Sequence, residues 1–191
     1  MIVTDDPCQK FISERPKHEI ICSPTFHEHP YADEILKKVT KAIEYFPEIT
    51  TPIQLARHGT KGANYAIAYV RWHGVVIPEI NFNIRFNSSM NTIFHEIGHV
   101  LQYSDREIPF GEESCSIFAL ARMPTDLVDS NKIPYIGLVP MDKVQYYCKM
   151  ALDQRNNQKC RSYIKWLRER LRHDHDPLTW PKFDVFREDL D

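Results

Sequence analysis

The apolar positions follow a helical period in several stretches of the chain. Predicted helices cover residues 31–46, 90–103, 112–123, 142–152 and 158–172. Ser88-Ser89 supplies an N-cap for the second of these helices, and Pro124 ends the third. Their apolar residues fall on one side of each helix, which indicates helices that pack against a shared core.

Between the first two helices the period changes to that of β-strands. Residues 63–70 and 75–77 are rich in Tyr, Ile and Val and flank a Trp72-His73-Gly74 turn. Apolar and polar residues then alternate from Ile80 to Phe86, which predicts a strand with one buried face. Because Pro78 has no N–H to give to a strand ladder, we expect this strand at the edge of the sheet.

These elements predict a single α+β domain. At about 150 residues per domain, a chain of 191 residues holds one domain. We place it at residues 31–172, after an irregular lead-in at 1–30 and before an acidic tail at 173–191.

Composition narrows the class of protein. The net charge of −2 gives no general attraction to nucleic acid or to a membrane surface, and no glycine-rich phosphate loop occurs. The first residues, Met1 to Pro7, are acidic, and no apolar run predicts a signal peptide or a membrane helix. The 5 cysteines form no CxxC pair, so we expect reduced thiols and a cytoplasmic protein, with Cys115 and Cys148 as small core residues.

The second predicted helix carries His95-Glu96-Ile97-Gly98-His99, an HExxH motif. Histidines at positions i and i+4 share one face of a helix, so both imidazoles can bind one zinc ion. Glu96 lies beside them and is placed to act on a water molecule at that ion as a general base. The motif therefore predicts zinc-dependent hydrolysis.

A hydrolytic zinc site needs a third protein ligand and one open position. Glu113 lies on one stripe with Ile117 and Leu120, so periodicity favours it as the inward-facing ligand. Glu112 aligns with Ser116 and Ala119, and it remains the alternative.

The motif and the helix that follows it, Glu113 to Pro124, resemble the ImmA/IrrE family of small gluzincin-type metallopeptidases. The resemblance carries over His95 and His99 as zinc ligands, Glu96 as the catalytic residue and Glu113 as the third ligand. It implies a zincin-like fold, in which a small twisted sheet with an edge strand packs on the HExxH helix and the glutamate helix. It also implies regulatory cleavage of a cytoplasmic protein, often a transcriptional repressor.

The predicted function is that of a zinc metallopeptidase, an endopeptidase whose extended substrate pairs with the edge strand at 80–86. A further donor to the oxyanion formed during hydrolysis is expected. Its candidates are Tyr103, His73, Tyr135 and Arg106, which the sequence does not rank.

Residues 155–172 form a basic segment with one acid, Glu169. We interpret it as the solvated face of an amphipathic helix, and give second place to a nucleic-acid or acidic-partner surface. The alternative function follows from that second interpretation: a non-catalytic regulator that keeps a zincin fold and binds DNA or a partner. The intact Glu96 favours the enzyme, because a purely structural zinc site does not need it.

Overall fold

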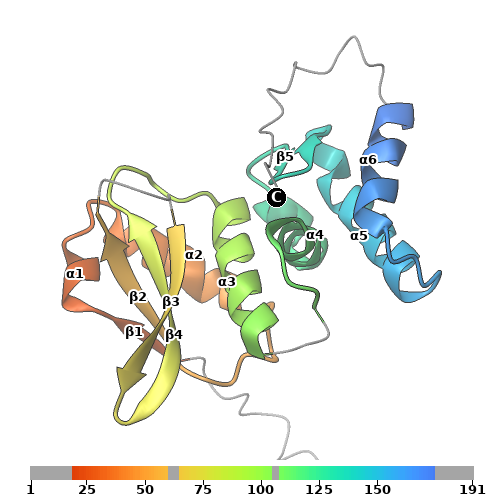
Figure 1. Ribbon diagram of the computed structural model, residues 1–191. Coiled ribbons are helices and arrows are strands. Elements are labelled where there is room, and N and C mark those ends of the chain that lie inside the picture. The colour runs from red at the N-terminus through yellow and green to blue at the C-terminus, as the bar shows by residue number, and fades with distance from the viewer. Residues whose placement is uncertain (1–18, 60–64, 105–107, 175–191) are drawn as a thin grey trace, which may run out of the picture.

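The computed structural model describes residues 19–59, 65–104 and 108–174. Most of the predicted lead-in and tail, and Arg106, lie outside these ranges. The fold is α+β, with an open sheet followed by a series of helices (Figure 1).

The sheet contains β1 (Ile20–Cys22), β2 (Ile53–His58), β3 (Tyr65–Trp72) and β4 (Val75–Asn83). The strand order is β1-β2-β4-β3. β1, β2 and β4 run parallel, whereas β3 and β4 form an antiparallel hairpin across the predicted turn. The sequence analysis did not predict β1 or β2.

The prediction that residues 80–86 form an edge strand is wrong. β4 runs without a break from Val75 to Asn83 and pairs on both sides, with β2 and with β3. Pro78 is tolerated because pairing with β2 begins only at Glu79, so no N–H is required from Pro78 on that side. Within the described sheet the edge positions belong to β1 and β3.

The helices are α1 (Pro24–His27), α2 (Ala32–Ile43), α3 (Met90–Ser104), α4 (Glu112–Arg122), α5 (Val144–Asn156) and α6 (Tyr163–Asp174). α2 to α6 confirm the predicted helices within a few residues at each end, whereas α1 lies in the predicted lead-in and was not expected. The largest difference is the start of α6, predicted at 158. Lys159 adopts a left-handed backbone (φ 54°), so the chain turns there before it becomes helical.

The packing places α3 and α4 in the middle of the molecule. α2 and α3 pack on the sheet side, α4 packs between α3 and α5, and α6 packs on α5 (Figure 1). The core on the sheet side joins Ile35 of α2, Leu55 of β2, Phe82 of β4 and Ile97 of α3, all of which are fully buried. The HExxH helix is therefore held on two sides by apolar contacts.

The N-terminus of α3 is fastened by two groups. Ser89 caps it as predicted, since its hydroxyl accepts a hydrogen bond from the Thr92 N–H. The Asp129 carboxylate, distant in sequence, accepts further bonds from the N–H groups of Met90 and Asn91. Asp129 leads into a short hairpin of β5 (Lys132–Ile133) and β6 (Gly137–Leu138), whose base is thus tied to α3.

The predictions that Cys115 and Cys148 are core residues and that no helix crosses a membrane can both be compared with the described part of the chain. Cys115 and Cys148 are buried in the core, as predicted, and both are free thiols. Over the described residues, none of the helices combines the length and the apolar character needed to cross a membrane.

Candidate metal centre

His95 and His99 project from the same face of α3. Their Nε2 atoms lie 3.0 Å apart, and their rings meet edge to face with centroids 4.6 Å apart. His95 is 6% exposed, which places this pair below the protein surface. The predicted pairing of the two histidines on one helix face is therefore present in the structure.

Glu112, at the first position of α4, completes a triangle with the two histidines. Its Oε2 lies 3.0 Å from His95 Nε2 and 3.1 Å from His99 Nε2. His95 and His99, whose imidazoles donate to this carboxylate when they are protonated, hold the pKa of the Glu112 carboxyl well below its usual range. Three potential ligand atoms from two helices thus converge on one point.

Glu113, which periodicity favoured as the third ligand, does not take part in this cluster. The Glu113 carboxylate turns away from the histidines and forms an ion pair with Arg168 of α6. Glu112 is the alternative that the sequence left open for the third ligand.

Periodicity favoured Glu113 because α4 has two packed faces. Seven of its residues are buried, so burial periodicity does not identify a single inward stripe. Glu112, Cys115, Ser116 and Ala119 form the stripe that faces α3, and the Cys115 thiol donates to the His95 carbonyl oxygen. The stripe that includes Glu113 faces other elements instead.

Gly98 lets the two helices approach closely enough for Glu112 to reach the histidines. A Cβ atom at position 98 would lie 2.8 Å from the Cys115 sulfur and 3.3 Å from the Ala119 Cβ. The small residues of α4 opposite this glycine are a signal in the sequence that could have identified the facing stripe.

Gly98→Ala is expected to destabilise the fold. Overpacking of this contact costs about 1–3 kcal/mol, and the higher helix propensity of Ala returns about 1 kcal/mol, so the net loss should be about 1 kcal/mol. Urea unfolding of the variant measures it. In a Cys115→Ala background the loss should shrink to about 0.5 kcal/mol or less, since the sulfur is gone. An equal loss in both backgrounds would contradict the contact as its cause.

The hydrogen bonds of Gln102 define the tautomer of His99. Gln102 is 2% exposed, and its side-chain NH₂ donates to the carbonyl oxygens of Pro109 and Gly111. Its Oε1 therefore faces His99 Nδ1, 2.8 Å away, and accepts a hydrogen bond from it. With the proton on Nδ1, the lone pair of neutral His99 lies on Nε2, toward the triangle.

Ser116 acts in the same way on His95. The Ser116 hydroxyl donates to the Glu112 carbonyl oxygen at 2.9 Å, so its oxygen accepts from His95 Nδ1 at 3.0 Å. The lone pair of His95 then also lies on Nε2. Supporting hydrogen bonds to the outer nitrogen of each imidazole are the usual arrangement around metal-binding histidines.

These tautomers bring three hydrogen-bond acceptors together. A proton on His99 or a metal cation can occupy the point between them. Burial acts to lower the pKa of His99, but the hydrogen bonds and charge of Glu112 outweigh it and raise this pKa; burial lowers the pKa of His95. Ligand atoms around a tetrahedral zinc ion lie about 3.3–3.5 Å apart, so the triangle is only slightly tighter than that spacing.

Glu96 follows His95 on α3 and is 6% exposed. Burial raises the pKa of its carboxyl to about 7, with a smaller opposing effect from His99 and a smaller raising effect from Glu112. A carboxylate with a pKa near neutrality exchanges protons readily at physiological pH.

Cys115 lies near the histidines, and the potential ligand atoms of His95, His99 and Cys115 are all within 4.8 Å of one another. Its thiol is occupied as a donor to the His95 carbonyl oxygen, and burial raises its pKa well above the usual value. The Cys115 sulfur also faces Gly98, so in this structure the residue contributes to the packing of α4 on α3.

Among the predicted oxyanion donors, the structure brings Tyr135 to the cluster. Its ring stacks on His95 with centroids 6.0 Å apart. Tyr103 instead contacts Tyr69 and Phe110, and His73 lies in the exposed turn between β3 and β4. Arg106 is outside the described residues.

We compared the chain with protein-family models, with curated proteins and with solved structures. No family model, curated protein or solved structure matches it. The interpretation of the cluster therefore rests on its own geometry.

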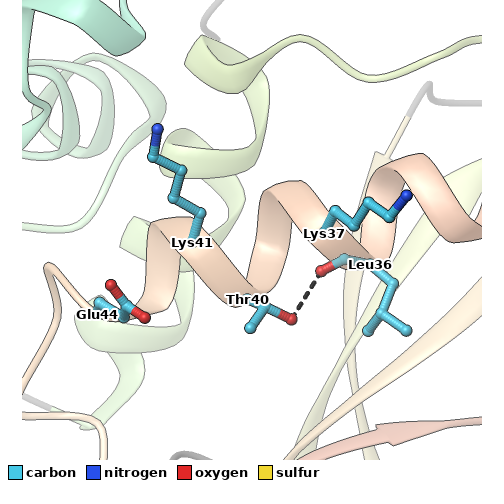
Figure 2. A pocket seen from close by; sticks show the side chains of 5 residues that line it. All are labelled: Leu36, Lys37, Thr40, Lys41 and Glu44. Atoms are coloured by element: carbon cyan, nitrogen blue, oxygen red, sulfur yellow. Dashed lines mark hydrogen bonds between the residues drawn. The ribbon is translucent and has the colours of Figure 1, made fainter.

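One surface hollow lies away from this cluster. It is lined by Leu36, Lys37, Thr40, Lys41 and Glu44, all on α2 (Figure 2). Its one hydrogen bond between lining residues runs from the Thr40 hydroxyl to the Leu36 carbonyl oxygen within the helix. Nothing in this lining offers convergent ligand atoms, so we assign it no chemistry.

Proposed function

We propose that this chain is a zinc-dependent endopeptidase of the zincin type. The observation that carries the proposal is the triangle of His95 Nε2, His99 Nε2 and Glu112 Oε2, with sides of 3.0–3.1 Å. Both imidazoles direct a lone pair into it, and a carboxylate supplies the third donor atom. This ligand set and its supporting hydrogen bonds suit zinc.

His95, His99 and Glu112 would hold the ion, in place of the trio with Glu113 that the sequence favoured. When bound, zinc supplies Lewis-acid chemistry, lowering the pKa of a water molecule and polarising the substrate carbonyl. Three protein ligands leave one position open for these groups.

Glu96 would transfer the proton, first as a general base and then as a general acid. Its carboxylate takes a proton from the water as the water oxygen bonds to the carbonyl carbon, and it delivers that proton to the amide nitrogen as the C–N bond breaks. The products are a carboxylate and an amine.

The edge strand β3 favours an extended peptide as substrate. β3 pairs only with β4 within the described sheet, and it contacts α3, the helix that carries the histidines. A peptide that adds to its free edge gains backbone hydrogen bonds whatever the amino-acid sequence of the peptide. β3 thus takes the role that sequence analysis gave to residues 80–86.

The test is a metal and activity measurement on the purified chain. We expect about one zinc ion per chain and cleavage of a randomised, internally quenched peptide library. Removal of zinc with 1,10-phenanthroline should abolish cleavage, and added zinc should restore it. If the zinc-loaded chain leaves the whole library intact, the endopeptidase proposal fails.

Cleavage of a repressor-type protein in the cytoplasm remains a proposal from the family resemblance. A non-catalytic DNA-binding or partner-binding role is the second candidate, because Arg161, just before α6, and Lys165 and Arg172 on α6 are exposed. Binding of duplex DNA that weakens steeply with salt would favour it.

A further inference from the structure

Tyr135 lies at the tip of the β5–β6 hairpin and adopts a left-handed backbone, with φ 63°. Such a conformation is unfavourable for a tyrosine and persists only where surrounding contacts impose it. The ring is nevertheless 58% exposed. The unfavourable backbone conformation of Tyr135 therefore places a large aromatic side chain with a polar hydroxyl at the surface.

Contacts at the base and at the tip hold this hairpin. At its base, Asp129 caps α3 and the Asn91 side chain donates to the Ser130 carbonyl oxygen. At its tip, Arg168 of α6 donates to the Tyr135 carbonyl oxygen while its guanidinium also pairs with Glu113. Tyr135 is therefore positioned by both α3 and α6.

Its side chain contacts two residues of the candidate metal site. The ring stacks on His95, and burial, the Glu112 charge and a hydrogen bond to Glu112 together raise the pKa of its hydroxyl. The hydroxyl thus lies beside one proposed ligand while the ring lies on another. A neutral phenol in this place is a hydrogen-bond donor at the rim of the site.

We propose that the Tyr135 hydroxyl is a catalytic hydrogen-bond donor to the carbonyl oxygen of the scissile peptide bond, where negative charge develops during hydrolysis. This inference rests on the proposed peptidase function and deepens it. Loss of one such donor typically lowers turnover by about 10²–10³-fold.

The test compares Tyr135→Phe with Tyr146→Phe, which removes the hydroxyl of a similarly exposed tyrosine (51%) on α5. Three quantities are measured: zinc affinity, library cleavage, and binding of an N-phosphoryl dipeptide whose phosphoryl oxygens mimic the developing charge. For Tyr135→Phe we expect zinc affinity and KM within about threefold of the unaltered chain, kcat about 100-fold lower, and N-phosphoryl dipeptide binding about 30-fold weaker or more. Tyr146→Phe should match the unaltered chain.

Three results would overturn the inference. The first is that kcat and N-phosphoryl dipeptide binding stay unchanged in Tyr135→Phe. The second is that the zinc-loaded unaltered chain does not bind this probe. The third is that the activity loss follows a loss of zinc, which would make Tyr135 a positioning residue for Glu112. If the unaltered chain binds the probe through Tyr135 but cleaves no peptide, the endopeptidase proposal alone fails.

Discussion

Glu112→Gln is expected to lower the zinc affinity of the chain by about 100-fold or more, because an amide oxygen replaces a charged ligand. The Glu112 carboxylate is the only anionic group within 3.1 Å of both imidazole Nε2 atoms among the described contacts. Competition with a fluorescent zinc chelator measures the affinity, and elemental analysis measures the stoichiometry.

Glu113→Gln is the matched control, since it makes the same chemical change one residue further along α4. It should keep zinc affinity within about threefold of the unaltered chain, because Glu113 pairs with Arg168 rather than with the histidines. Loss of this partly exposed ion pair should cost less than about 1 kcal/mol of stability. Zinc loss in Glu113→Gln with retention in Glu112→Gln would reverse the assignment and restore the sequence-based one.

Glu96→Gln should separate metal binding from chemistry. Gln matches the buried Glu96 in shape, and Glu96 is not one of the proposed ligands, so the variant should keep about one zinc per chain and bind the N-phosphoryl dipeptide. Hydrolysis of the peptide library should fall by about 10³-fold or more, because an amide neither accepts nor delivers the proton. Persistent cleavage would exclude Glu96 as the base.

The helices could be predicted from the sequence because each has a clear apolar period and recognisable ends. The order of the strands could not, since β2 contributes a short run, Ile53–His58, and β4 carries a proline that suggested an edge. Pro78 lies just outside the stretch that pairs with β2, and only the register reveals this.

The candidate site was predictable as far as one helix defines it. His95, Glu96 and His99 share α3, so their spacing alone brings them together. The third group required the packing of a second helix, and α4 is buried on two sides, which made the apolar stripe of Glu113 misleading. The supporting contacts of Gln102 and Ser116 depend on both helices and have no local signal.

The close approach at Gly98 ties the reach of Glu112 to the absence of a side chain. A Cβ atom at position 98 would push against α4, at a point one helical turn or less from either histidine. If the proposed zinc site forms, its affinity should therefore depend on position 98, which supplies no ligand atom, because a single added methyl group would alter the contact between the two helices that carry the ligands.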